Sequence, residues 1–111
     1  MPRQEDLRYI EYEFRKKGFE CFYEPFERDR PDMIAINEEK IILIELKTGR
    51  EASSTIFQKM KWMKERKEEL YRKISKRKVE FLLVIPNLKR DVKEKLEKEG
   101  ISVLFKPILG L

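Results

Sequence analysis

The sequence contains no histidine among its 111 residues. This absence excludes Ser-His-Asp chemistry, histidine-bound metals and histidine acid–base catalysis. The single cysteine, Cys21, allows no internal disulfide and cannot form a zinc site alone, so we expect it to be a small core residue of a strand. The four glycines, at positions 18, 49, 100 and 110, match neither a phosphate-binding P-loop nor a dinucleotide fingerprint. Any catalysis must therefore use carboxylates, lysine and a metal ion.

Long apolar runs are also missing. No stretch approaches the ~20 apolar residues that cross a bilayer, and the N-terminal residues lack the apolar core of a signal peptide. We therefore expect a cytoplasmic protein without membrane contact. A chain of 111 residues is long enough for one modest core, which predicts a single domain over 1–111. Abundant Lys and Glu, with two Gln and two Asn, resemble the composition of hyperthermophile proteins.

The most informative stretch is residues 30–49, where two apolar runs, 32–37 and 40–46, flank a polar turn. This pattern predicts a β-hairpin. A turn centred between Glu38 and Glu39 makes facing residue numbers sum to 77, which sets Asp32 opposite Glu45 with Cβ atoms about 4.5–5.5 Å apart. Lys47 lies two residues beyond Glu45 and projects to the same side. The sequence therefore predicts that two carboxylates and one ammonium converge.

Both predicted strands are apolar on both faces, which is typical of strands buried in a covered sheet. Charged groups at the end of such a hairpin are costly unless they bind something, and Mg²⁺ takes oxygen ligands from one or two carboxylates. The alternative is an ordinary salt-bridge cluster of Asp32, Glu45 and Lys47 at a sheet edge. Charged residues make up 42% of the chain, so the spacing alone does not decide between the two.

Pro31-Asp32, followed by Glu45-Leu46-Lys47 at the end of the next apolar strand, resembles the motif of the PD-(D/E)XK nuclease superfamily. The predicted order of elements over about residues 5–85 is similar to the core of that family, and among its small members the chain looks most like archaeal Holliday-junction resolvases and VRR-type nucleases. The resemblance implies a restriction-endonuclease-like α/β fold. We accordingly expect a mixed sheet of about five strands, flanked by helices, in the order αβββαβαβ.

The resemblance also implies roles for individual residues. Asp32, Glu45 and the carbonyl of Leu46 would bind Mg²⁺, for which Mn²⁺ would substitute, and Lys47 would act on the attacking water. These nucleases often carry a further metal-associated Glu on the preceding helix, which here implies Glu11. From position alone, Glu11 could equally reach the rim of the core. Two alternatives on that helix are Glu5 and Glu13, the latter predicted to face solvent.

The remaining elements follow from periodicity and from helix start and stop residues. We predict a first helix over 5–17 ending at Gly18, and a strand over 19–26. A long helix over 52–75 follows, with Ser53 or Ser54 as capping candidate. A strand over 79–85 leads to a helix capped by Asn87 and ended by Gly100. The last strand, 101–105, should lie parallel to its neighbour.

The long helix and its end form the predicted basic surface. Residues 59–78 contain ten Lys or Arg against three Glu, a net charge of +7, whereas the whole chain carries +5. Such a surface beside a metal site fits binding of the nucleic-acid backbone. The alternative is a solvated helix face held by the pairs 68–72 and 69–73. The candidate phosphate contacts are Lys59, Lys64, Lys73 and Arg77.

Two further groups are candidates for DNA contact. Arg28 and Arg30 stand just before Asp32, where they could hold a phosphate or simply be solvated loop charges. Gln58 and Trp62 lie four residues apart, away from the apolar stripe of the long helix. They are similar to the Gln-x-x-x-aromatic element of several nuclease branches. The alternative is a surface glutamine beside a packed tryptophan.

The combined prediction is a Mg²⁺-dependent deoxyribonuclease that hydrolyses phosphodiester bonds, an endonuclease on structured or duplex DNA. Two alternatives are a catalytically inactive nucleic-acid-binding module of the same fold, and a structural protein with an acidic cluster. DNA is the expected partner. A homodimer is also a candidate state, since nucleases of symmetric junctions pair two sites by two-fold symmetry.

Overall fold

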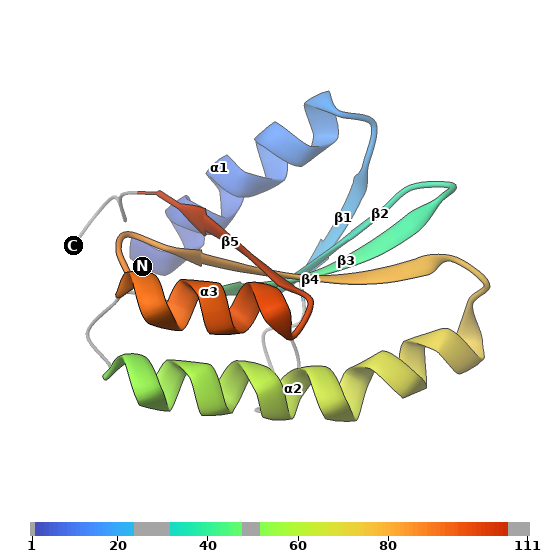
Figure 1. Cartoon of the computed structure of the whole chain (residues 1–111). Coiled ribbons are helices and arrows are strands. Elements are labelled where there is room, and N and C mark those ends of the chain that lie inside the picture. The colour runs from blue at the N-terminus through green and yellow to red at the C-terminus, as the bar shows by residue number, and fades with distance from the viewer. Residues whose placement is uncertain (1, 24–31, 48–51, 107–111) are drawn as a thin grey trace.

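The order of helices and strands is the predicted one, αβββαβαβ. The structure, a computed structural model, describes residues 2–23, 32–47 and 52–106 (Figure 1). Its elements are α1 (Pro2–Lys16), β1 (Glu20–Tyr23), β2 (Met33–Ile36), β3 (Lys40–Leu46), α2 (Ser53–Ile74), β4 (Lys78–Ile85), α3 (Arg90–Lys98) and β5 (Ile101–Phe105). The part of the 19–26 strand prediction that falls on 24–26 lies outside the described residues.

The five strands form one mixed sheet in the order β1-β2-β3-β4-β5. The first three strands pair antiparallel, whereas β3, β4 and β5 run parallel, as predicted for the last strand. The turn between β2 and β3 is closed by Asn37, whose side-chain oxygen accepts the N–H groups of Glu39 and Lys40, both at 2.8 Å. Because this turn fixes the register, Met33 faces Ile44, as the predicted pairing requires.

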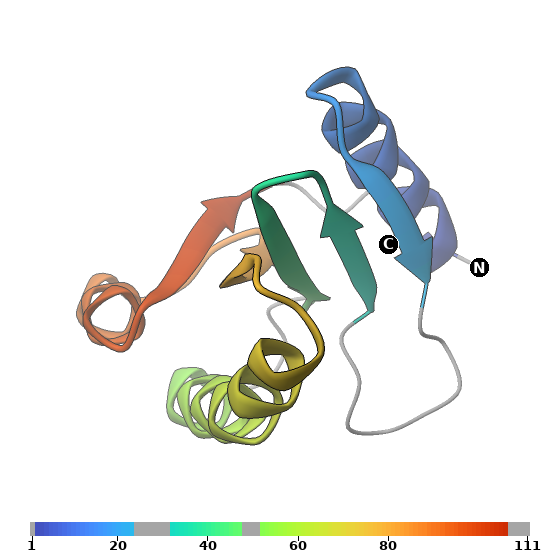
Figure 2. The ribbon, with the colours of Figure 1, turned by 90° about the vertical axis from the view of Figure 1, so that its right-hand side faces the viewer.

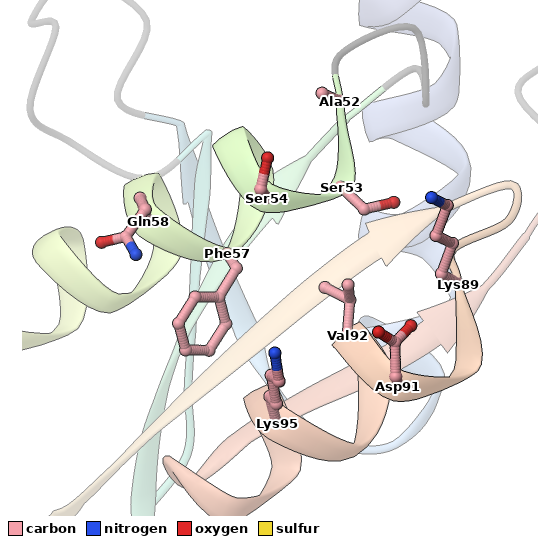
Figure 3. Close-up of a pocket in the computed structure, with 9 residues that line it drawn as sticks. All are labelled: Ala52, Ser53, Ser54, Phe57, Gln58, Lys89, Asp91, Val92 and Lys95. Atoms are coloured by element: carbon pink, nitrogen blue, oxygen red, sulfur yellow. The ribbon is translucent and has the colours of Figure 1, made fainter.

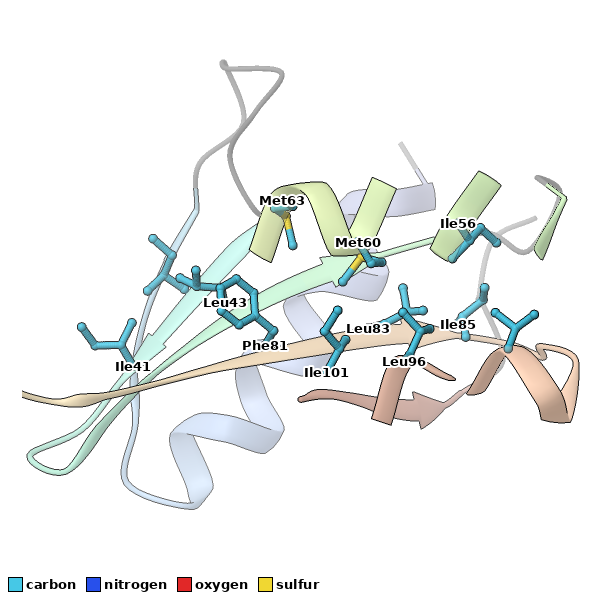
Figure 4. Close-up of a cluster of buried hydrophobic side chains, with 12 residues drawn as sticks. Ile41, Leu43, Ile56, Met60, Met63, Phe81, Leu83, Ile85, Leu96 and Ile101 are labelled. Carbon is cyan, nitrogen blue, oxygen red and sulfur yellow. The ribbon is translucent and has the colours of Figure 1, made fainter. Parts of the chain in front are cut away.

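Helices cover both faces of the sheet (Figures 1 and 2). The side chains of β2 and β3 alternate between two buried clusters, which confirms the prediction that both faces of these strands are apolar and covered. The cluster beneath α2 and α3 is shown in Figure 4 and includes Ile34, Ile41, Leu43, Ile56, Met60, Phe81 and Leu96. The cluster beneath α1 includes Leu7, Ile10, Cys21, Met33, Ala35, Ile42, Ile44 and Leu46. Asp32 and Glu45 alternate with this second set, so they project on the α2 side.

The helix ends agree with the predicted stops but not with the predicted starts. Gly18 and Gly100 have φ of +92° and +82°, the left-handed conformation in which glycine ends a helix. The predicted capping residues are wrong. Ala52 and Lys89 precede α2 and α3 with no side-chain cap bond. Ser53 and Ser54 already lie in the first turn of α2, so they are past its N-cap position. Asn87 lies in the connection from β4, before the N-cap position of α3.

The apolar side chains of α2 are less covered toward its C-terminal end. Ile56, Met60 and Met63 are buried, whereas Leu70 and Ile74 are 50% and 69% exposed. The core therefore covers the first turns of α2 more completely than its last ones, although Tyr71 still packs against the core cluster. No helix among the described residues is both long and apolar enough to cross a membrane.

Candidate active site

The predicted convergence of Asp32, Glu45 and Lys47 rests on the hairpin register. Met33 pairs with Ile44, and the same register extended by one residue sets Asp32 opposite Glu45. The Lys47 N–H donates to the Val84 carbonyl at 3.0 Å, which continues the β3–β4 pairing past the last residue of β3. Lys47 therefore keeps the strand alternation and projects to the same side as Glu45. The three groups lie where β3 ends and β2 begins.

Asp32 is held against the main chain of β3. Its Oδ2 accepts the Leu46 N–H at 2.7 Å, a short distance typical of a charge-assisted bond. The bond places the Asp32 carboxylate beside Leu46, which lies between Glu45 and Lys47 in the chain. A carboxylate has about four lone-pair sites, so the bond to the Leu46 N–H does not by itself exhaust its capacity to accept.

Glu45 and Lys47 form a sheltered ion pair. The Lys47 Nζ lies 3.9 Å from the Glu45 Oε1, and the two side chains are 18% and 12% exposed. Charges removed from water in this way are less screened than surface pairs. Because 3.9 Å exceeds the length of a hydrogen bond, the contact is electrostatic and does not fix the ammonium to one carboxylate oxygen.

The donor set at this strand end suits a hard divalent cation. Asp32 and Glu45 supply two carboxylates, and Leu46, which follows Glu45 and bonds Asp32 through its N–H, supplies a main-chain carbonyl oxygen. Mg²⁺ binds through one or two carboxylates and retains several waters, so this set meets its requirement. Within 2–23, 32–47 and 52–106, no three Asp, Glu or Cys side chains gather as a ready-made metal cluster. A metal here would therefore depend on water and substrate for its remaining ligands.

Glu11 lies on the α1 side of the sheet, whereas Asp32 and Glu45 project on the α2 side. Its carboxylate accepts the Tyr23 hydroxyl and the Arg15 Nε, the latter at 2.7 Å, on the α1 side of the sheet. These bonds, the Tyr23 bond foremost, lower the pKa of Glu11. Burial and the bond to Glu11 raise the pKa of Tyr23 well above its ordinary range. Glu11 thus ties α1 to β1.

The other acids of α1 lie elsewhere. The Glu5 side chain is outside the described part of the chain, and Glu13 is half-buried rather than solvent-facing, near Lys106. Sequence reasoning missed Asp6, a carboxylate that is only 4% exposed. The available signal was its position four residues before Ile10, one turn away on the same face.

The candidate phosphate contacts divide between two flanks of α2. Lys64 pairs with Glu68 at 3.3 Å and lies beside Gly100, where its ammonium would be 3.4 Å from an added Cβ. It therefore faces α3. Counting about 100° per residue, Lys59 and Lys73 lie on the opposite flank. Lys73 is 71% exposed and pairs with Glu69 at 3.3 Å. Arg77 is exposed just after the helix.

A groove of about 590 Å³ lies between the start of α2 and α3 (Figure 3). Ser53, Gln58, Lys89, Asp91 and Lys95 are among its lining residues. The sequence prediction included Gln58, which is exposed here, but it missed Lys89, just before α3, and Lys95 within α3. The basic residues of α3 are nearly balanced by its acidic ones, so no net positive charge drew attention to this helix. Arg28 and Arg30, also predicted as phosphate contacts, lie outside the described residues.

A solved structure has the same fold as this chain. No family model and no curated protein matches the sequence. The crystal structure of a repair endonuclease from Pyrococcus abyssi matches with a TM-score of 0.69 and 25% sequence identity, over 95% of this chain. The two chains share a fold. The match covers 46% of the endonuclease, so this chain spans less than half of that protein's length. The five-stranded mixed sheet with three helices is thus a nuclease-like fold.

Proposed function

We propose that this chain is a divalent-metal-dependent deoxyribonuclease of the PD-(D/E)XK type, which hydrolyses phosphodiester bonds. One observation carries the proposal. The Asp32 carboxylate is bonded to the Leu46 N–H, between Glu45 and Lys47, at the end of a buried strand. The fold shared with a repair endonuclease also supports the proposal. The resemblance to PD-(D/E)XK nucleases implies a metal-binding set at this strand end.

Asp32, Glu45 and the Leu46 carbonyl would hold the metal, with Mg²⁺ as the expected ion and Mn²⁺ as a substitute. When bound, the metal supplies Lewis-acid polarisation of the scissile phosphate. The Lys47 ammonium orients the attacking water, and its charge offsets the negative charge that builds up on the phosphate in the transition state. The sheltered position of Lys47, only 18% exposed, makes that charge more effective than one in bulk water.

DNA would approach from the α2 side, because Asp32, Glu45 and Lys47 project there. Lys59, Lys73 and Arg77 supply phosphate contacts along that side. The pair of Lys73 with Glu69 is no obstacle, since exposed ion pairs contribute little and exchange partners readily. Lys64 is less suited to this role because it faces α3.

The test is a cleavage assay on linear duplex, single-stranded, flapped and four-way-junction DNA, with Mg²⁺, with Mn²⁺ and with EDTA. We expect cleavage with either metal and none with EDTA. The Glu45→Gln variant, which keeps size and polarity but loses charge, should bind DNA and fail to cut it. Binding without cleavage by the parent protein would instead favour an inactive nucleic-acid-binding module.

Oligomeric state bears on the substrate. A dimer with two sites related by two-fold symmetry suits a symmetric junction, whereas a monomer suits an end or a flap. Sedimentation of the parent protein at assay concentration shows whether it is a dimer or a monomer. A monomer would argue against a symmetric junction as the substrate.

A further inference from the structure

Trp62 is an exposed aromatic residue on a cationic flank of α2. The residue is 45% exposed, although tryptophan normally contributes large buried area. The guanidinium carbon of Arg66 lies 4.0 Å from the centre of the Trp62 ring. A cation at this distance covers one face of the indole and supports it by cation–π attraction. The side chain is therefore positioned on its helix while much of it stays in contact with solvent.

The surroundings of Trp62 point to a nucleic acid rather than to a protein partner. With about 100° per residue, Lys59, Trp62, Arg66 and Lys73 fall within about 60° of one another on α2. Two acids border this flank: Glu65, three residues after Trp62, and Glu69, which is paired with Lys73. A protein-binding patch would be apolar at its centre with few charges, whereas an aromatic ring among cations is the arrangement that binds nucleic-acid strands.

This flank also faces the side of the molecule where the candidate active site lies. The opposite flank packs toward α3, since Lys61 pairs with Glu99 at 4.0 Å and Lys64 lies beside Gly100. In Figure 2, α3 lies next to β5, whereas β2 is on the far side of β3 and β4. The Trp62 flank is thus turned toward β2, and Asp32 immediately precedes β2.

We propose that Trp62 is a stacking site for an unpaired base, so that the DNA recognised by this chain includes a single-stranded segment. This inference rests on the proposed function and narrows its substrate class to single-stranded, flapped or branched DNA. The bases of an intact duplex are stacked on one another and offer no open face to a side chain on a helix surface. An unpaired base of any identity can stack on indole, which predicts little sequence preference.

The chain contains a single tryptophan, so intrinsic fluorescence reports on this site directly. The parent protein is titrated, in EDTA and low salt, with a single-stranded oligothymidine and with a blunt-ended duplex of two annealed strands that has the same total number of nucleotides. Anisotropy of labelled DNA gives the occupancy. We expect quenching of indole emission on the single strand and little change on the duplex at equal occupancy.

Two variants extend the test. Trp62→Ala should weaken single-strand binding about 5- to 150-fold and leave duplex binding within about two-fold, whereas Trp62→Phe should retain part of the affinity. Tyr12→Ala is the matched control. Tyr12 is also an exposed aromatic, 59% exposed with the Lys16 Nζ 5.0 Å from its ring centre, but it lies on α1. Its replacement should change neither affinity.

Unchanged emission at full occupancy, or equal loss on both DNAs in Trp62→Ala, overturns the stacking proposal. Because binding is measured in EDTA, this failure is separate from a failure of the nuclease proposal. Stacking can be absent while Mg²⁺-dependent cleavage persists, and stacking can be present in a protein that cuts nothing. If the parent protein binds neither DNA at low salt, both proposals are wrong.

Discussion

The Asp32 carboxylate combines a structural bond with a proposed chemical role, and two substitutions separate them. Asp32→Ala removes the acceptor of the Leu46 N–H, a partly buried bond of 2.7 Å. Loss of such an acceptor costs about 1–2 kcal/mol. Unfolding entropy is about 2.1 cal/mol/K per residue, so each 1 kcal/mol corresponds to roughly 4 °C in a domain of 111 residues. We therefore expect the alanine variant to melt about 4–9 °C lower.

Asp32→Asn keeps an oxygen at the same position, so the Leu46 N–H retains an acceptor and the melting temperature should fall by less than about 4 °C. The amide carries no charge and is a poor ligand for Mg²⁺. Cleavage should therefore fall to below about 1% of the parental rate in both variants. The assay is calorimetric melting and initial cleavage rate on the same preparations. An asparagine variant that cuts at the parental rate would refute the metal-ligand role, whatever its stability.

Three further changes test other parts of the molecule. Lys47→Met keeps the apolar stem and should reduce the cleavage rate about 100-fold with melting near the parental value; a large melting change with normal turnover would indicate a salt-bridge role instead. Glu11→Gln should cleave normally and be less stable than the parent at neutral pH. The lowered pKa of Glu11 adds stability above its ordinary pKa of 4.5, which is lost as pH falls through the folded value, so this difference should shrink in acid. Lys59→Ala with Lys73→Ala should reduce the slope of log K against log salt on duplex DNA by about 1.8, whereas Lys64→Ala, its matched control, should leave the slope unchanged.

The hairpin and its register could be predicted because they depend on local chemistry. A polar turn between two apolar runs leaves few pairings, and a slip by one residue would expose an entire buried face. The same register sets Asp32 opposite Glu45, and the alternation of side chains along β3 directs Lys47 to the same side. The parallel pairing of β4 and β5 was predictable as well. In a strand-helix-strand unit the helix returns the chain to the same end of the sheet by a right-handed crossover, so the second strand runs parallel to the first.

Features that depend on tertiary packing could not be predicted. Periodicity placed Glu11 near the core stripe of α1, but only the fold shows that Tyr23 of β1 and Arg15 bind its carboxylate. The capping predictions were wrong because a Ser53 cap requires α2 to begin one residue later than it does, whereas an Asn87 cap requires α3 to begin two residues earlier than it does. The connections between layers decide where each helix begins. The division of the α2 lysines was hidden for a similar reason, since composition does not indicate which flank of a helix packs against α3.

The most direct test of the proposed active site is the initial rate of DNA cleavage as a function of free Mg²⁺, measured for the parent and for Glu45→Gln at equal DNA occupancy. We predict a saturable increase for the parent, no cleavage after chelation with EDTA, and a rate at least about 100-fold lower for the variant across the titration. Equal rates for the two proteins, or cleavage by the parent that is independent of Mg²⁺, would contradict the assignment of the Asp32, Glu45 and Lys47 strand end as a metal-dependent nuclease site.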